Sequence, residues 1–216
     1  MTTVAVMQPY FLPYAGYFRL FAAADHVALF DCVQFPRRGW VHRNRFPDAA
    51  GDAEWLTLPL QRAPVETLIR DLRFADDAES RLRTARQRFP VLRDCDHPLG
   101  NEVQRLEGSV CDYLERLLGL CCNCLGLPFR TIRTSSLGLD PALRGQERVI
   151  AAARALGATR YMNLEGGRAL YDPDAFRHHA MELHFLPEWR GARWSILYRL
   201  LTEPADAIAA EIRAQV

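Results

Sequence analysis

Lysine is absent from the 216-residue sequence, so all 27 of its basic side chains are arginines. The absence excludes a lysine Schiff base with pyridoxal phosphate, and it excludes a P-loop lysine on the phosphates of a nucleotide. Arginine binds carboxylate or phosphate through two parallel hydrogen bonds, but it is a poor proton carrier because it stays charged. The cationic side chains therefore point to anion binding rather than to proton transfer.

Long apolar runs are also missing, and no stretch approaches the roughly 18 residues that span a bilayer. Residues 1–4 lack the basic and apolar segments of a secretory signal. A net charge of +1 gives no electrostatic reason for a nucleic acid partner. We therefore expect one cytoplasmic domain over residues 1–216, with small-molecule substrates and no membrane insertion.

The six cysteines do not form two Cys-x-x-Cys pairs, which is the spacing typical of structural zinc sites. Disulfides are rare in the cytoplasm, so a disulfide framework is not expected. Cys121, Cys122 and Cys124 are predicted to be buried apolar thiols in a helix, because free cysteine packs as a small hydrophobic residue. The sequence predicts no metal site, and whether these three thiols bind anything stays open.

The opening of the chain predicts a β-loop-α-β unit, with a strand at 3–7, a helix at 17–24 and a strand at 27–30. Further strands are predicted at 55–60, 67–74, 129–134, 159–162 and 182–186. Further helices are predicted at 76–89, 98–125, 147–156, 172–178, 195–201 and 205–214. Residues 35–52 show no periodicity and are predicted to form a long loop. The fold class is thus α/β, with an open, mostly parallel sheet flanked by helices and a helical C-terminal part.

The first candidate site is the loop after the first strand, because ligands of open parallel sheets bind beyond the carboxyl ends of the strands. Gln8, Tyr10, Tyr14 and Tyr17 would supply donors and stacking faces there, and Pro9 is a further candidate for substrate binding. The amides at the start of the helix favour an anion, and Gly16 would let a ligand approach the main chain. Local packing of the aromatic rings is the alternative.

A second candidate site is the arginine-rich stretch 37–45. Arg38, Arg43 and Arg45 could bind phosphate or carboxylate, with Trp40 as a stacking plate and Asn44 among them. His42 is the candidate general base because it lies inside this stretch. A solvated basic loop is the alternative.

A third candidate site is the turn at 163–167, where Asn163 and paired glycines follow a predicted strand. This turn would lie at the same edge of the sheet as the first loop. An ordinary turn that ends a strand explains the pattern equally well.

The run 7–18, Met-Gln-Pro-Tyr-Phe-Leu-Pro-Tyr-Ala-Gly-Tyr-Phe, resembles the opening of the WbqC-like proteins, which are associated with O-antigen and specialised-metabolite gene clusters. The resemblance continues through 31–35, which includes Cys32 and Gln34, through 38–40 with 43–45, and through 55–57, 135–136, 156–158 with Tyr161, and 167–171. A more distant likeness is to nucleotidylyltransferases and adenylate-forming ligases with a Rossmann-like fold. Tyr14 and Tyr17 stand where that superfamily has two histidines.

The resemblance implies a Rossmann-like enzyme that joins an acyl or aminoacyl group to an amine on an amino-sugar or small metabolite. Its donor would bear phosphate, such as ATP with magnesium. A carrier protein would be a fitting partner, and the protein could form a homodimer.

Two alternatives remain open at this point. The first is a cysteine-dependent thioester acyltransferase that uses Cys32. The second is a non-catalytic ligand-binding or scaffold protein of the same pathway.

Overall fold

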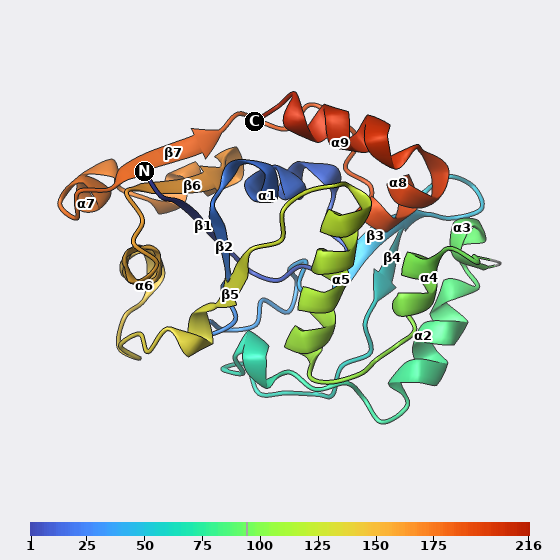
Figure 1. Ribbon diagram of the computed structural model, residues 1–216. Coiled ribbons are helices and arrows are strands. Elements are labelled where there is room, and N and C mark those ends of the chain that lie inside the picture. The colour runs from blue at the N-terminus through green and yellow to red at the C-terminus, as the bar shows by residue number, and fades with distance from the viewer. Residues whose placement is uncertain (94) are drawn as a thin grey trace.

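The computed structural model describes residues 1–93 and 95–216, and its centre is a sheet of five parallel strands (Figure 1). The strands are β1 (Thr3–Met7), β2 (His26–Leu29), β5 (Thr131–Arg133), β6 (Arg160–Leu164) and β7 (Glu182–Leu186), and their order is β5-β2-β1-β6-β7. The order reverses at β1, since the strands that follow in sequence are added first on one side and then on the other. This is the Rossmann-like arrangement, in which ligands bind beyond the carboxyl ends of the strands at the reversal.

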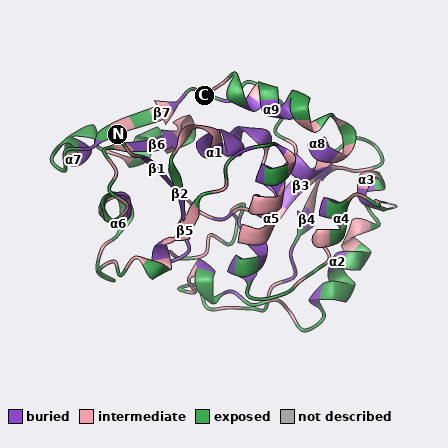
Figure 2. Cartoon of the chain, in the orientation of Figure 1, coloured by how far each residue is buried: buried purple, intermediate pink, exposed green. Residues whose placement is uncertain are grey.

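Strand β1 is buried on both faces, as central parallel strands are, and Figure 2 shows it among the buried parts of the chain. Val4 and Val6 face a cluster of apolar residues on α6 (Gly145–Ala155). Ala5 faces the opposite way and belongs to the larger core. The β-branched composition of the strand follows from this double burial.

Helices cover both faces of the sheet (Figure 1). On the face of the larger core lie α1 (Arg19–Ala23), α5 (Val110–Cys124) and α9 (Ala205–Arg213), and the short 3-10 turn η1 (Ala15–Phe18) leads into α1. On the other face lie α6 and α7 (Pro173–Arg177). The turns η3 (Thr134–Ser136) and η4 (Glu165–Leu170) follow β5 and β6.

An antiparallel hairpin of β3 (Arg43–Pro47) and β4 (Ala53–Thr57) lies beside the sheet. Four short helices surround it: α2 (Ala78–Arg86), α3 (Pro90–Arg93), α4 (Pro98–Glu102) and α8 (Ile196–Thr202). Phe46 of β3 packs on Phe89, with the ring centroids 5.5 Å apart. Both rings belong to the larger core, so the hairpin and the sheet share one apolar interior.

The α/β fold class and the parallel sheet are confirmed, and strands 3–7 and 182–186 have the predicted bounds. The prediction of a long unstructured loop over 35–52 is wrong, because β3 lies within it. Alternation does occur in β3, where Asn44 and Phe46 are buried and their neighbours are half-buried. The sequence pattern does not indicate this strand, because one of the two buried residues is a polar asparagine.

Two other predicted elements differ in the structure. Residues 67–74 form the 3-10 turn η2 (Ile69–Asp71) and isolated bridges instead of a strand. The helix predicted over 98–125 is interrupted between α4 and α5. Gly108 has a φ of +75°, and Ser109 begins α5 with a capping box to Asp112, so both residues favour a new helix start there.

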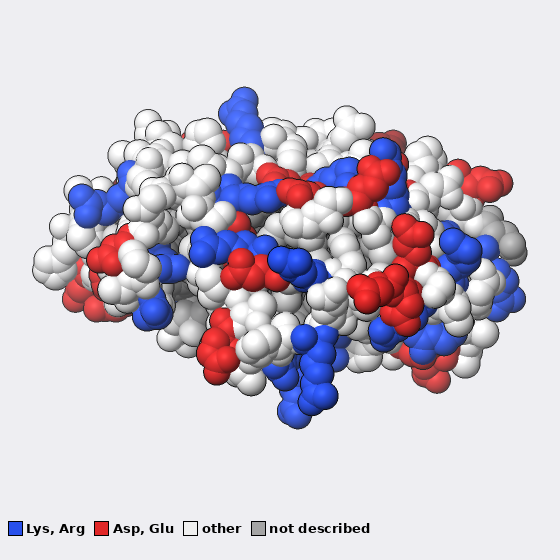
Figure 3. Space-filling model, turned by 90° about the horizontal axis from the view of Figure 1, so that it is seen from below, with Lys and Arg blue, Asp and Glu red and all other residues white. Residues whose placement is uncertain are grey.

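No helix among residues 1–93 and 95–216 is long and apolar enough to cross a membrane. Arginine and acidic side chains are interspersed on the face shown in Figure 3. That face therefore presents no continuous patch of one charge.

Candidate functional site

A pocket of about 830 Å³ lies at the reversal point of the sheet. Its walls come from the carboxyl ends of β1, β6 and β7, the first loop, and the hairpin strand β3. Eight of the sequence-predicted residues line it: Gln8, Tyr10, Tyr14, Tyr17, Trp40, Asn44, Arg45 and Asn163. The fold thus brings all three candidate stretches to one cavity, large enough for a ligand of several hundred daltons.

The first loop supplies aromatic walls. Tyr17 is fully buried and donates a hydrogen bond from its hydroxyl to the carbonyl of Gln8 at 2.8 Å. Burial raises the pKa of Tyr17 well above its usual value, so the group stays protonated. Burial also raises the pKa of Tyr10, whose ring lies 5.5 Å from that of Tyr17. Pro9 is buried in the loop and lies outside the lining.

Leu12 gives the first loop its unusual path, with a φ of +48° that leucine rarely adopts. The Asn44 amide donates to the carbonyls of Phe11 and Leu12 at 3.2 and 2.5 Å, and the Ser195 hydroxyl donates to Leu12 at 3.0 Å. The Asn44 carbonyl oxygen in turn accepts from the amide of Arg45. Asn44, predicted to bind substrate, therefore uses its side chain to hold the loop against β3.

Gly16 makes room for aromatic side chains. A Cβ atom at this position would lie 2.7 Å from the Trp189 ring and would also clash with Tyr14. The sequence suggested that Gly16 lets a ligand approach the main chain. The structure instead fills that space with the rings of Tyr14 and Trp189, whose centroids are 6.4 Å apart.

Arg45 is the lining arginine with the fewest partners. Its guanidinium lies 5.5 Å from the ring centroid of Trp40 and 5.8 Å from that of Trp55. Its Nε is buried without an acceptor, and within residues 1–93 and 95–216 its side chain forms neither a hydrogen bond nor an ion pair. Stacking thus fixes the guanidinium in the wall of the pocket while its donors stay free.

The other predicted arginines lie outside the lining. Arg43 stacks on Trp55 at 4.2 Å and donates to the carbonyls of Gly39 and Arg38. Arg38 is exposed and offers its backbone carbonyl to Arg43. Arg43 is therefore committed to the loop that carries Trp40.

His42, the predicted base, also lies outside the lining, with its ring 5.0 Å from that of Phe35. Its Nδ1 is buried without a hydrogen-bond partner. Burial, with a smaller effect of Arg43, lowers the pKa of His42 to about 4. The ring is neutral at physiological pH, but no pocket wall includes it.

Cys32 and Gln34 are likewise outside the pocket. Cys32 is only 6% exposed, and its Sγ lies 3.1 Å from the Thr134 hydroxyl and 3.3 Å from the Arg148 guanidinium. Gln34 donates from its side chain to the carbonyl of Val65. A thioester mechanism through Cys32 would need a route to this thiol that the pocket does not provide.

Asn163 lines the pocket at the end of β6, but its side chain is internally satisfied. Its amide donates to the hydroxyls of Tyr161 and Tyr171 at 3.0 and 3.2 Å, and its oxygen accepts from the amide of Leu164. A Cβ on Gly167 would lie 2.9 Å from the Asn163 amide. Asn163 and Gly167 therefore set the shape of the turn that forms this part of the pocket wall.

A model of the WbqC-like protein family matches residues 8–195, a range that holds all of the lining except Val6 and Met7. The chain belongs to the WbqC-like protein family. Among relatives of this WbqC-like chain is the uncharacterized protein Rv1507c of Mycobacterium tuberculosis (strain ATCC 25618 / H37Rv). It is 29% identical over 185 residues, which cover 82% of this chain and 78% of the relative. No solved structure matches the chain.

Sequence reasoning missed the β7 side of the pocket of this WbqC-like protein. Glu188, Trp189 and Arg193 line it just after β7, and Arg19 lines it from α1. The rule that placed the first loop at the carboxyl end of β1 would also have indicated the residues after the predicted strand 182–186. Arg19 could have been predicted to line the pocket from its position, two residues after Tyr17 and at the start of the first helix.

The lining of the WbqC-like pocket, as far as the structure describes it, holds no histidine, cysteine, serine or threonine. Its ionisable groups are tyrosines, Glu165, Glu188 and three arginines. The Arg168 guanidinium holds the pKa of Glu165 below its usual value, so this group stays a carboxylate. Within the same residues, no group of three or more His, Cys, Asp and Glu side chains is placed to hold a metal ion. The arrangement can bind anions and aromatic groups and can stabilise developing negative charge.

Proposed function

We propose that this protein is a cytoplasmic amide-forming transferase that moves an acyl or aminoacyl group from a phosphate-bearing donor to an amine of a sugar or small metabolite. The observation that carries the proposal is Arg45, whose guanidinium packs against two adjacent indole rings in the pocket wall and has no acceptor of its own. The buried Nε and the unpaired charge of this half-buried side chain would both gain a partner if an anion bound in the pocket. Its neighbour Trp40, which is 37% exposed, offers a planar surface for the donor.

In the proposed reaction the amine nitrogen attacks the acyl carbon, and a carbon–nitrogen bond forms. The bond from that carbon to the leaving oxygen breaks, and the phosphate leaves with the electron pair. The proton lost by the amine passes to water in the pocket. Arg45 stabilises the charge on the leaving group, so the protein acts by positioning and electrostatics and forms no covalent intermediate.

The test is binding of nucleotides, nucleotide-sugars, coenzyme A thioesters and amino acids, measured by thermal shift and by calorimetry. We expect one phosphate-bearing class to bind, and Arg45→Ala to weaken it about 10- to 100-fold, because a charge-assisted pair is lost. Arg38→Ala is the matched control, since Arg38 lies in the same arginine-rich stretch outside the lining, and only its backbone carbonyl has a partner within the described residues. The expected change for this control is less than about twofold.

Two results would contradict the proposal. One is that no phosphate-bearing ligand binds; the other is that both arginine variants weaken binding equally. A bound donor that is never turned over with any amine would instead favour a non-catalytic ligand-binding protein. The absence of histidine and cysteine from the described lining is what favours that second candidate function.

A further inference from the structure

Arg19 is a buried cation whose partners are all uncharged. It is 1% exposed, at the start of α1. Its Nε donates to the carbonyl of Gly16 at 3.2 Å, and its Nη1 donates to the carbonyls of Pro187 and Gln215 at 2.9 and 3.0 Å. None of the carboxylates described in residues 1–93 and 95–216 lies within 4.0 Å of it. Its positive charge is therefore retained without a counterion.

This charge belongs to the pocket, because Arg19 is one of the lining residues. Its guanidinium packs against the Trp189 ring, 5.4 Å from the ring centroid. Burial lowers the pKa of Arg19, yet an arginine stays protonated in a protein. Hydrogen bonds to carbonyls offset only part of the desolvation penalty of a buried cation. A bound anion would offset more of this penalty.

Two donors beside this charge are free. Arg19 uses Nε and Nη1, and its Nη2 has no partner within residues 1–93 and 95–216. Tyr14 also lines the pocket, and its hydroxyl forms no hydrogen bond within the same residues. Arg19 lies near enough to oppose the effect of burial, which raises the pKa of Tyr14. The hydroxyl therefore stays protonated and can donate.

The neighbouring charges do not neutralise Arg19. Arg193 lies over the Tyr14 ring at 6.0 Å, and it pairs with Glu188 at 2.9 Å. The charges of this pair cancel, so the positive charge of Arg19 dominates this part of the wall. Arg45 is a separate positive charge of the same pocket, because it comes from the hairpin and packs against other tryptophans.

We propose that Arg19 and Tyr14 form a subsite for a carboxylate, separate from the Arg45 subsite. One guanidinium nitrogen and one hydroxyl match the two oxygens and the single charge of a carboxylate better than those of a phosphate. The assignment of this carboxylate to the second substrate, the amine acceptor, rests on the proposed function. The acceptor class is then a small amine that also bears a carboxylate, such as an amino acid.

The experiment titrates the protein with glycine and with glycinamide, its uncharged analogue at the carboxyl end, and follows binding by ligand-observed NMR. We expect glycine to bind, and glycinamide to bind at least about tenfold more weakly. Tyr14→Phe should weaken glycine about tenfold, because one hydrogen bond to a charged group is lost while the ring stays. Tyr198→Phe, on α8 and outside the lining, should leave glycine binding unchanged.

Glu188→Gln is the second variant, chosen because a substitution of the buried Arg19 would disturb folding as well as binding. It removes the negative charge that cancels Arg193 beside Tyr14, so the wall becomes more positive and glycine should bind several-fold more tightly. Equal binding of glycine and glycinamide, no binding of either at tens of millimolar, or no effect of Tyr14→Phe would each overturn the subsite.

Arg45→Ala separates this subsite from the proposed function. It should weaken the phosphate-bearing ligand and leave glycine unchanged. If it weakens glycine while Tyr14→Phe does not, the pocket has one anion site and the inference fails. If no phosphate-bearing ligand binds but glycine behaves as expected, the proposed donor fails and the carboxylate subsite stands.

Discussion

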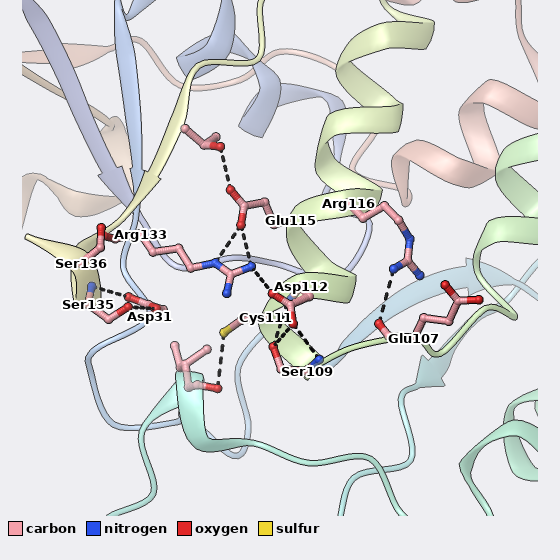
Figure 4. A network of polar contacts seen from close by, with 12 residues as sticks. Asp31, Glu107, Ser109, Cys111, Asp112, Glu115, Arg116, Arg133, Ser135 and Ser136 are labelled. Carbon is pink, nitrogen blue, oxygen red and sulfur yellow. Dashed lines mark hydrogen bonds and ion pairs between the residues drawn. The ribbon is translucent and has the colours of Figure 1, made fainter.

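The charged side chains at the carboxyl ends of the strands differ between the two halves of the sheet. Beyond β1, β6 and β7, Arg45 and Arg19 line a cavity without any acidic partner in the described residues. Beyond β2 and β5, the charged groups are matched by partners within the protein (Figure 4). Arg133 pairs with Asp112 and Glu115, at 2.7 Å in each case.

Asp31 is the centre of the matched half. It is 1% exposed and accepts from the Thr134 hydroxyl at 3.1 Å, from the Ser135 amide at 2.9 Å and from the Ser135 hydroxyl at 2.6 Å. Arg148 donates to the carbonyls of Cys32 and Asp140 nearby. The same edge of one sheet thus carries internal polar contacts in one half and lines an open cavity in the other.

The largest expected loss of stability comes from a substitution in the matched half, at Asp31. Asp31→Ala removes the acceptor of three hydrogen bonds, and a buried donor without a partner costs about 1–3 kcal/mol, so we expect a loss of about 4 kcal/mol. The measurement is the free energy of unfolding in urea. Asp52→Ala, an exposed aspartate whose carboxylate forms no hydrogen bond in the described residues, is the control. A cost of less than about 1 kcal/mol for Asp31→Ala would show that the network is not structural.

The second test uses pH to separate the matched half from His42, which lies just before β3. The pKa of His42 falls from 6.5 to about 4 on folding, so the unfolded chain binds the proton more tightly. The contribution of neutral His42 to the free energy of unfolding is fully present above pH 6.5. It is lost as the pH drops toward 4, and the loss reaches up to about 3 kcal/mol. Hydrogen bonds from Ser109 hold the pKa of Asp112 at about 2, below its usual 3.8, so the matched half loses stability only at lower pH.

Urea unfolding of His42→Leu between pH 7 and 4 checks this prediction. The variant should lose the decline seen in the unchanged protein. His179→Gln, at an exposed histidine, should keep the decline. The same decline in His42→Leu would assign it to other groups.

Arg133→Met sharpens the comparison at one arginine of the matched half. The variant keeps most of the aliphatic stem and loses the bonds to Asp112 and Glu115. We expect a cost of about 1–2 kcal/mol in urea unfolding at pH 7, because these carboxylates are only partly exposed. A neutral result would mean that water replaces the guanidinium without loss.

Arg45→Met is the matched substitution in the open half and has the smallest expected effect on folding. No hydrogen bond is lost, a buried Nε without an acceptor is removed, and some stacking on Trp40 is given up. The free energy of unfolding should stay within about 0.5 kcal/mol of the unchanged protein. A loss as large as that of Arg133→Met would show that the charge of Arg45 supports the fold.

The sheet could be predicted from the sequence because its central strands are buried on both faces. That burial requires short β-branched runs such as Val4-Ala5-Val6, and glycine or proline often marks their ends. The first loop was found by the same reasoning, since the place of β1 in a parallel sheet fixes where its carboxyl end opens. Strand β3 was missed because Asn44 occupies a buried position where an apolar residue is expected.

The distinction between Arg43 and Arg45 could not be predicted. Both lie on one stretch of sequence, and only the hairpin register, which pairs Arg45 with Trp55 and Arg43 with Thr57, separates their surroundings. Arg193 and Glu188 lie far along the chain from the first loop, so their approach depends on the strand order. No local pattern contains that order.

Arg19 links the pocket to the last turn of the chain through the carbonyl of Gln215. A purification tag fused after Val216 would therefore begin one residue from a contact that orients a pocket side chain. A tag placed before Met1, which is 73% exposed, begins at a freely accessible end. Binding experiments on this protein should use the N-terminal position, and a difference between the two tagged forms would itself report on Arg19.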